Sequence, residues 1–418
     1  MKVSGRVRVP GDKSISHRAL MLAALGDGSS RVTRILDSAD VRSTAGVLRA
    51  LGVDVPPLSP DFVVAGRGLR GLRAPDEDLD CGNSGTTARL MAGVAAAQPF
   101  ASRFVGDASL SKRPMARVAR PLSAMGASFE LSPGETLPMV VHGAELEKAE
   151  WHNEKSSAQV KSAILLAAAC AGVEAVVREP TRSRDHTERM LAARGAEVWV
   201  NDDAVLLWPV QGLPRLDVVV PGDPSSAAFF VAVAALATEG TLTLPDVCLN
   251  PTRTGFFFAL ARMGVRIDVD DERTEGGETV GTLAVSPGEL RATEIAPAEV
   301  PSLIDELPML ACLATRAEGE TVVRGAEELR VKESDRIAAV VGNLRALGAD
   351  ADELPDGFVV RGNGAPLKGR ITTHGDHRLA MAFGVLGALP GNEIEVDDPG
   401  CVDVSFPTFW RDLDAAVR

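Results

Sequence analysis

The sequence predicts an α/β (α+β) fold of two inside-out domains, each made of three repeated helix/strand folding units with buried apolar helices. Two observations support this prediction. One short pattern recurs along the chain, in which a helical segment ends at a glycine and a strand pattern follows. An Ala/Leu-rich segment, apolar on nearly all sides, precedes each copy. The copies follow one another every 69 to 84 residues, whereas solenoid repeats usually span about 20–50 residues.

The recurring pattern is clearest in the stretches LRALGVDV, LSAMGASFE, LAARGAEVWV, LARMGVRIDV and LRALGADADE. A glycine commonly ends a helix because it adopts the left-handed backbone conformation at no steric cost. The C-terminal stretch FWRDLDAAVR is a sixth, shortened copy. The five glycines that end a helical segment are Gly52, Gly126, Gly195, Gly264 and Gly348.

The Ala/Leu-rich segments lack a polar face. A helix that is apolar all round is buried rather than placed on the surface. We therefore expect the sheets to cover these helices, which is the reverse of a protein with a central sheet. The segments are residues 88–97, 163–172, 228–237, 308–317 and 378–389.

Two Pro-Gly pairs interrupt strand patterns and predict where the chain passes between domains. They are Pro10–Gly11 and Pro221–Gly222. Two crossings make one domain discontinuous, formed by residues 1–11 and 222–418. Residues 12–221 form the other domain, and we expect the active site in the cleft between the two.

Composition restricts the partners of this chain. Its 418 residues carry a formal charge of −13, only 4% are aromatic, and no tyrosine is present, so neither a base-stacking surface nor an aromatic membrane belt is expected. The five cysteines are far apart without a CxxC pair, and the N-terminus MKVSGRVRVP has charges where a signal peptide is apolar. We expect a cytoplasmic protein that binds neither nucleic acid nor membrane and acts as a monomer.

Polar and basic side chains gather at the heads of the apolar helices. In PGDKSISHRALMLAAL, Lys13, Ser14 and Arg18 precede a purely apolar stretch. The helix macrodipole disfavours cations at this end, although each motif alone fits capping or a surface ion pair. Their recurrence favours a small anionic ligand. Similar heads are CGNSGTTARLMAG, EKSSAQVKSAILLAA, VPSLIDELPMLA, LRVKESDRI and GDHRLAMAFG, with basic loops in GDASLSKRPMARV and TRSRDHTERML.

These motifs, in this order and over essentially the whole chain, resemble the 5-enolpyruvylshikimate-3-phosphate synthase family, the 3-phosphoshikimate 1-carboxyvinyltransferases. The resemblance implies two inside-out domains of three folding units each, in agreement with the repeats. It also implies transfer of the carboxyvinyl group of phosphoenolpyruvate to the 5-hydroxyl of shikimate 3-phosphate through a tetrahedral adduct, without metal or organic cofactor.

The resemblance implies a role for individual residues. Asp305 accepts the proton of the 5-hydroxyl, and Glu333, with Lys13, handles the proton at the methylene carbon. The residues implied for shikimate 3-phosphate are Lys13, Ser14, Arg18, Ser157, Gln159, Arg184, Asp305 and Lys332, and those implied for phosphoenolpyruvate are Lys13, Gly85, Arg113, Gln159, Arg336 and Arg378.

The chain departs from the family pattern at two positions. Val404 stands where some members carry a lysine, which puts one phosphate contact in doubt, and Ala158 replaces a second serine. Gly85 matches the glycine at which glyphosate-tolerant members often carry alanine, whereas SAQVK and RDHTE resemble the subclass in which tolerance occurs. Giving the glycine more weight, we expect glyphosate to compete with phosphoenolpyruvate.

Two alternatives belong to other functional classes. UDP-N-acetylglucosamine enolpyruvyl transferases share the fold but usually carry a cysteine in the loop that reads GDASLSKRPM here, where no cysteine occurs. A non-catalytic phosphosugar or RNA-end binding protein would have no use for Asp305 and Glu333 beside the cations.

Overall fold

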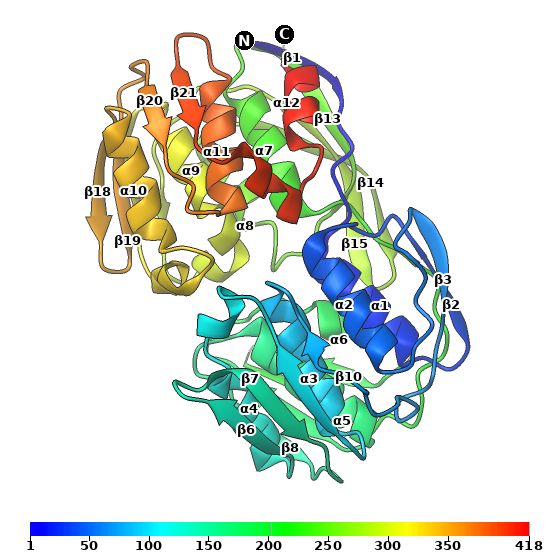
Figure 1. Ribbon diagram of the computed structural model, residues 1–418. Coiled ribbons are helices and arrows are strands. Elements are labelled where there is room, and N and C mark those ends of the chain that lie inside the picture. The colour runs from blue at the N-terminus through cyan, green and yellow to red at the C-terminus, as the bar shows by residue number, and fades with distance from the viewer. Residues whose placement is uncertain (202, 418) are drawn as a thin grey trace. The chain divides into compact units, whose positions relative to one another are not determined.

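The computed structural model describes residues 1–201 and 203–417 and divides into two compact units (Figure 1). The terminal unit consists of Met1–Pro10, Pro221–Arg273 and Thr279–Arg418, and the internal unit consists of Gly11–Val220 and Thr274–Glu278. The division expected from the sequence did not place residues 274–278 in the internal unit. They form the tip of a hairpin whose strands lie mainly in the terminal unit.

Within the described residues, the strands of the internal unit form three mixed sheets. In each sheet the first two strands are parallel and a buried helix connects or flanks them, while the later strands are antiparallel. The sheets are β12 (Val218–Val219), β2 (Ser29–Thr33), β3 (Asp61–Ala65); β4 (Leu79–Asp80), β5 (Ala101–Val105), β7 (Thr136–His142), β6 (Ser128–Ser132); and β8 (Ala149–His152), β9 (Ala175–Arg178), β11 (Ala204–Leu207), β10 (Val198–Val200).

The described strands of the terminal unit also form three sheets, again with a parallel pair in each. They are β1 (Lys2–Arg6), β13 (Glu239–Cys248), β15 (Glu278–Ser286), β14 (Arg266–Glu275); β16 (Glu294–Ile295), β17 (Gly319–Val323), β19 (Gly357–Gly362), β18 (Asp350–Leu354); and β20 (Lys368–Ile371), β21 (Glu393–Val396).

Strand pairing explains why the chain passes from one unit to the other near residues 10 and 220. In the terminal unit, β1 pairs in parallel with β13, and Lys2 lies opposite Glu239. In the internal unit, β12 pairs in parallel with β2, and Val218 lies opposite Val32. Each unit therefore completes one of its sheets with a strand that is distant in sequence.

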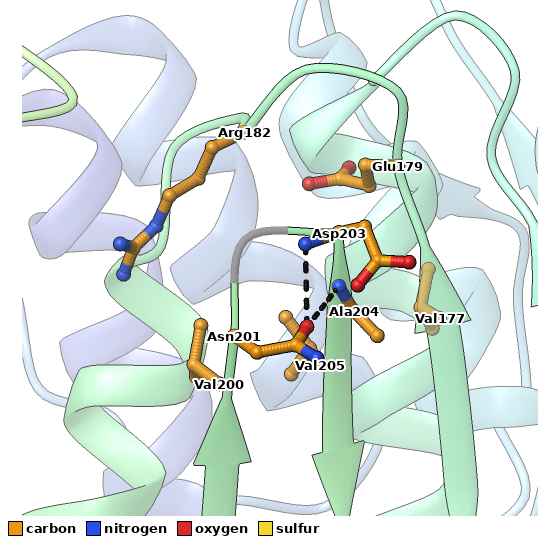
Figure 2. A pocket seen from close by; sticks show the side chains of 8 residues that line it. All are labelled: Val177, Glu179, Arg182, Val200, Asn201, Asp203, Ala204 and Val205. Atoms are coloured by element: carbon orange, nitrogen blue, oxygen red, sulfur yellow. Dashed lines mark hydrogen bonds between the residues drawn. The ribbon is translucent and has the colours of Figure 1, made fainter.

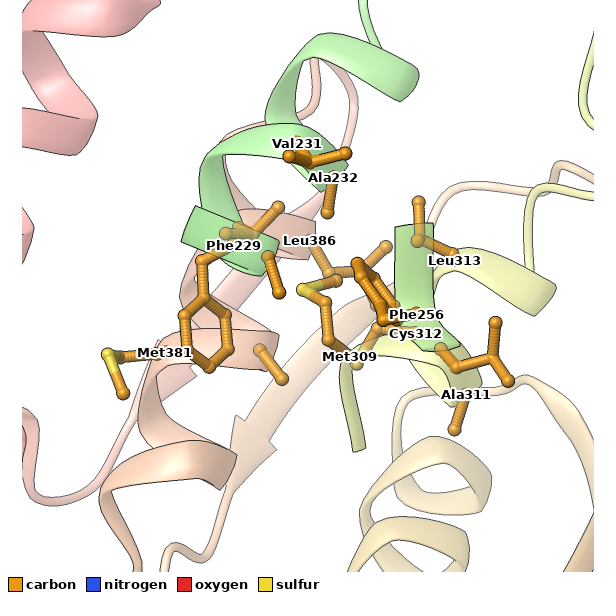
Figure 3. Packing of buried hydrophobic residues seen from close by; sticks show 14 of the residues in the cluster. Phe229, Val231, Ala232, Phe256, Met309, Ala311, Cys312, Leu313, Met381 and Leu386 are labelled. Atoms are coloured by element: carbon orange, nitrogen blue, oxygen red, sulfur yellow. The ribbon is translucent and has the colours of Figure 1, made fainter. Parts of the chain in front are cut away.

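The apolar helices are buried within their units, as the sequence predicts. All residues of α7 and α9 are buried, and Figure 3 shows Phe229 of α7, Met309 of α9 and Met381 of α11 in one apolar cluster. Burying a large apolar side chain contributes about 1.5–3 kcal/mol, so these helices supply much of the stability. The six are α1 (Lys13–Ala24), α3 (Gly85–Ala96) and α5 (Ala158–Ala171), and α7 (Pro224–Ala235), α9 (Leu307–Ala314) and α11 (His377–Gly387).

The second helix of each repeat is more exposed and ends as the recurring glycine predicts. Gly52, Gly126, Gly195, Gly264 and Gly348 all have φ between +84° and +114°, a region that other residues rarely adopt. The helices are α2 (Ala39–Ala50), α4 (Ala116–Ala124), α6 (His186–Ala192), α8 (Gly255–Arg262), α10 (Arg336–Ala346) and α12 (Phe409–Ala416). The last residue of the sixth copy, 418, lies outside the described residues.

Short 3₁₀ turns precede or follow several helices, and η3 carries the predicted site residue Asp305. They are η1 (Leu110–Lys112), η2 (Val300–Ser302), η3 (Ile304–Glu306), η4 (Glu327–Val331) and η5 (Pro399–Val404). Among the described residues, no helix has both the length and the hydropathy needed to cross a membrane.

Candidate active site

At the start of α1, an ion pair orients the side chain of Lys13 and an N-cap satisfies a backbone N–H group. Asp12 is the N-cap, and its Oδ1 accepts a hydrogen bond of 2.8 Å from the backbone N of Ile15. Lys13, the first residue of α1, forms an ion pair with Asp40 of α2, and its side chain is 21% exposed. The lysine is therefore oriented but still accessible to a ligand.

Arg18 lies one turn further along α1 and is buried. Its Nε donates to Oγ1 of Thr187 at 2.7 Å, one terminal nitrogen donates to Oγ of Ser162 at 2.7 Å, and the other donates to the backbone oxygen of Ser14 at 2.9 Å. These partners are all neutral. Burial lowers the pKa of Arg18 to about 10, and the nearby charge of Arg184 acts in the same direction. An anion bound beside these two arginines would relieve that cost.

Gly85 begins α3 beside two arginines. The N-cap Ser84 accepts a hydrogen bond from the backbone N of Thr87 at 3.1 Å. A Cβ built on Gly85 would lie 3.0 Å from Nη1 of Arg89 and 3.6 Å from Nη1 of Arg113. The two guanidinium groups thus lie close to the head of α3, and Arg113 is held by Asn83 Oδ1 at 2.7 Å.

Arg89 was not among the residues predicted from the sequence, although it belongs to the motif GTTARLM. It is buried, and its Nη1 donates to Oε1 of Gln159 at 2.6 Å. A signal was present, because an arginine on an otherwise apolar helix, one turn after a glycine head, needs a polar partner. Gln159 in turn donates to Oγ1 of Thr86 at 3.1 Å, so Arg89 joins the heads of α3 and α5.

The head of α5 leaves a hydroxyl available. Ser157 is the N-cap but makes no side-chain capping hydrogen bond. Its backbone oxygen accepts a hydrogen bond of 3.0 Å from the side chain of Asn153. Ala158, which begins the helix, contributes no second hydroxyl.

Lys161, one turn further along α5, has a structural environment. It is fully buried, with its Nζ 2.8 Å from Glu179 and 2.9 Å from Glu188. Burial alone would lower its pKa, but the two carboxylates outweigh burial and raise it. Because Lys161 forms ion pairs with two carboxylates of the protein, we assign it a structural role rather than a role in ligand binding.

A pocket is lined in part by Glu179, one of the two carboxylate partners of Lys161 (Figure 2). Figure 2 shows Oδ1 of Asn201 accepting hydrogen bonds from the backbone nitrogens of Asp203, at 3.2 Å, and Ala204, at 2.7 Å. The pocket is lined by Val177, Glu179, Arg182, Val200, Asn201, Asp203, Ala204 and Val205. None of these belongs to the predicted substrate or catalytic residues.

In the terminal unit, Arg336 is the centre of a buried charge network. Its Nε donates to Asp376 at 2.7 Å, and its terminal nitrogens donate to Glu333 at 2.6 Å and Asp305 at 3.1 Å. Burial alone would lower the pKa of Arg336, but the three carboxylates outweigh burial and raise it. Asp376 is also the N-cap of α11, accepting from the backbone N of Arg378 at 3.0 Å. Both Asp376 and Arg336 belong to motifs noted in the sequence, but their pairing was not predicted.

Asp305, in η3, faces three cations. Its Oδ1 is 3.1 Å from Arg336 and 3.8 Å from Lys332, and its Oδ2 is 3.8 Å from Arg378. Arg378 also donates to the backbone oxygen of Asp305 at 3.2 Å. The three cations thus surround the carboxylate that is expected to act as the general base.

The predicted residues divide into two groups, called here the internal and terminal clusters, according to the unit in which they lie. Val404 lies at the end of η5 and offers no charge in place of the family lysine. The internal cluster contains Lys13, Ser14, Arg18, Gly85, Arg113, Ser157, Gln159 and Arg184, and the terminal cluster contains Asp305, Lys332, Glu333, Arg336 and Arg378.

Comparisons with known proteins agree on one family. A profile described as EPSP synthase (3-phosphoshikimate 1-carboxyvinyltransferase) matches residues 1–413. The chain is 46% identical over 422 residues to a 3-phosphoshikimate 1-carboxyvinyltransferase of Sulfurihydrogenibium sp. (strain YO3AOP1), covering 100% of this chain and 98% of the relative. It is also 46% identical over 414 residues to the protein of that name from Desulforamulus reducens, covering 98% and 96%.

Solved structures give the same result. An EPSP synthase from Acinetobacter baumannii matches with a TM-score of 0.88 and 39% identity, over 100% of this chain and 96% of that chain. The enolpyruvyl transferase NikO from Streptomyces tendae matches with a TM-score of 0.74 and 18% identity, over 99% and 95%. The second likeness concerns the fold alone. Together with the buried helices and mixed sheets, these matches confirm the predicted fold class.

Proposed function

Because the chain belongs to the EPSP synthase (3-phosphoshikimate 1-carboxyvinyltransferase) family, we propose that it transfers the carboxyvinyl group of phosphoenolpyruvate to the 5-hydroxyl of shikimate 3-phosphate. The products are 5-enolpyruvylshikimate 3-phosphate and phosphate. The observation that carries this proposal is the family match over residues 1–413. The two clusters support it, because a reaction between two phosphorylated carboxylates needs many cations.

The internal unit supplies most of the residues for shikimate 3-phosphate. Arg18 and Arg184 suit its phosphate, because Arg18 is buried and hydrogen-bonded to neutral oxygens. The hydroxyl of Ser157 makes no capping hydrogen bond to α5. Charge-assisted hydrogen bonds from such groups contribute about 1.5–3 kcal/mol each. Lys13, Ser14, Gln159 and, from the terminal unit, Asp305 and Lys332 complete the set.

Phosphoenolpyruvate is assigned to cations of both units. Arg113 and Lys13 come from the internal unit, and Arg336 and Arg378 come from the terminal unit. Gly85 leaves room at the head of α3, where Arg89 and Arg113 lie. Gln159 contacts both substrates in this assignment.

In this proposal two carboxylates, Asp305 and Glu333, transfer the protons. Asp305 takes the proton of the 5-hydroxyl as the oxygen of that hydroxyl bonds to C2 of phosphoenolpyruvate. At the same time Glu333, with Lys13, delivers a proton to the methylene carbon C3. In the second step Glu333 removes a proton from C3, the double bond re-forms and the C2–O bond to phosphate breaks. Acid–base assistance of this kind contributes about 10²–10⁴-fold to a rate.

The two alternatives considered from the sequence lose support. The matching relatives and the structure from Acinetobacter baumannii carry the names of the main proposal, not of the UDP-N-acetylglucosamine transferase. A binding protein would not need Asp305 held between three cations. The cytoplasmic location and the monomeric state stay predictions of this proposal.

The proposal is tested by measuring phosphate release with the purified protein. Release should require both shikimate 3-phosphate and phosphoenolpyruvate, and mass spectrometry should detect the enolpyruvyl ether. Phosphate release with phosphoenolpyruvate alone, or equally well with UDP-N-acetylglucosamine in place of shikimate 3-phosphate, would contradict it. Lys112→Ala is a suitable control, because Lys112 lies in the same loop as Arg113 but has no assigned role.

A further inference from the structure

The tip of the β14–β15 hairpin contributes a buried carboxylate to the internal unit. The chain leaves the terminal unit after Arg273 and returns to it at Thr279. Within this tip, Oε1 of Glu278 lies 2.7 Å from Nδ1 of His186, and the two side chains are 1% and 0% exposed. Since a carboxylate can only accept, Nδ1 of His186 is the donor. His186 is the first residue of α6.

The backbone of the hairpin tip also fits closely against α6. Gly277 has φ +89°, and a Cβ built on it would lie 2.5 Å from the backbone oxygen of Arg189 and 3.2 Å from Cβ of Ala193. A side chain therefore cannot be accommodated there. In addition, Nε of Arg189 lies 2.9 Å from Asp185 Oδ1 and 4.0 Å from Glu278 Oε2. Two independent features, a glycine and a buried carboxylate, thus place this tip on α6.

The helix that receives the tip begins beside the proposed shikimate 3-phosphate residues. Arg184 is two residues before His186, and Thr187 follows it. Oγ1 of Thr187 accepts the hydrogen bond from Nε of Arg18. The charge of Glu278 also opposes the lowering of the pKa of Arg18 by burial. Residues 182–187, which comprise a loop and the first two residues of α6, are therefore held by Arg18 on one side and by Glu278 on the other.

We propose that Glu278 is a positioning residue for shikimate 3-phosphate binding. Acting through His186, it holds residues 182–187 so that Arg184 keeps its place at the substrate phosphate and Thr187 keeps its hydrogen bond with Arg18. The carboxylate does not itself touch the substrate. This inference rests on the proposed function, because that function assigns the loop to shikimate 3-phosphate.

The test compares Glu278→Gln and Glu278→Ala with Glu272→Gln, which alters an exposed carboxylate of β14. Hydrogen exchange of the amides in residues 182–187 and calorimetric binding of shikimate 3-phosphate are measured on the full chain. Glu278→Ala should raise both the exchange rate and the dissociation constant by about 10-fold, equivalent to about 1.4 kcal/mol. Glu278→Gln should have a smaller effect, because its amide oxygen still accepts from His186. The KM for phosphoenolpyruvate should change by less than about 2-fold, and Glu272→Gln should match the wild type.

The outcomes separate this inference from the proposed function. Unchanged exchange in residues 182–187 of both Glu278 variants would overturn the inference, as would faster exchange with unchanged affinity for shikimate 3-phosphate. If Glu278→Ala does not fold, as judged by circular dichroism, the nearly isosteric Glu278→Gln decides. If the wild type binds no shikimate 3-phosphate, the proposed function fails, and the exchange rates still decide whether Glu278 holds the loop.

Discussion

Replacing Gly85 by alanine tests how much room the head of α3 leaves for a ligand. The added Cβ would lie 3.0 Å from Nη1 of Arg89 and 3.6 Å from Nη1 of Arg113. Favourable contacts need about 3.5–4.0 Å, so the guanidinium of Arg89 must withdraw by roughly 0.5 Å. Because Nη1 of Arg89 also binds Gln159 at 2.6 Å, the displacement reaches a second proposed ligand residue. The methyl group and the displaced arginine both reduce the space beside Arg113.

The expected effect is greater on glyphosate than on phosphoenolpyruvate. Glyphosate has one more chain atom between its phosphorus group and its carboxylate, so it needs more of this space. Overpacking typically costs about 1–3 kcal/mol, which corresponds to about 5- to 150-fold in affinity. We expect the inhibition constant of glyphosate to rise within that range. The KM for phosphoenolpyruvate should rise by less than about 5-fold, because the end of the arginine side chain can yield to the smaller ligand.

The assay is phosphate release at saturating shikimate 3-phosphate, titrated with glyphosate at several phosphoenolpyruvate concentrations. Inhibition of the wild type should be competitive with phosphoenolpyruvate. The matched control is Gly46→Ala in α2, where an added Cβ meets no atom within 4 Å, and it should leave inhibition unchanged. Equal inhibition constants for the wild type and Gly85→Ala would refute this reasoning.

Three further predictions follow from the charge networks and from one buried histidine. Asp305→Asn should lower kcat by about 10²–10⁴-fold. The KM values of both substrates should stay the same or fall, because the three cations around residue 305 lose a competing anion. A wild-type kcat in steady-state kinetics would disprove the role of Asp305 as the base. Arg378→Ala should raise the KM for phosphoenolpyruvate by about 10-fold or more, with a smaller change in the KM for shikimate 3-phosphate. A change confined to the KM for shikimate 3-phosphate would contradict the assignment of Arg378 to phosphoenolpyruvate. His17 is fully buried, and burial lowers its pKa to about 3 from the 6.5 of the unfolded chain. The unfolded state therefore binds the extra proton, so this group removes about 1.4 kcal/mol of stability per pH unit as the pH falls from about 6 towards 3. His17→Asn should reduce that slope in urea unfolding at pH 7, 6 and 5, and an unchanged slope would show that another group is responsible.

The repeated architecture could be predicted from the sequence because it depends on local patterns, whereas the roles of the candidate site residues came from the resemblance of the motifs to a known family. A helix that is apolar all round must be buried wherever it lies, and a glycine after a helical segment marks its end through its own backbone freedom. Gly52 and Gly348 illustrate this, since both have positive φ. Ser14 and Arg18 were likewise placed on one face of a helix head, because they are four residues apart.

The tertiary structure was needed wherever a residue depends on a partner that is distant along the chain. Arg336 binds Asp376 across 40 residues and His186 binds Glu278 across 92, and no local periodicity encodes such pairs. The same holds for Arg89, whose partner Gln159 lies on another buried helix, and for residues 274–278, which pack with the internal unit. Hydrophobic patterning determines which face of a helix or strand is buried, whereas the partner of a buried charge depends on which segments folding brings within about 3 Å.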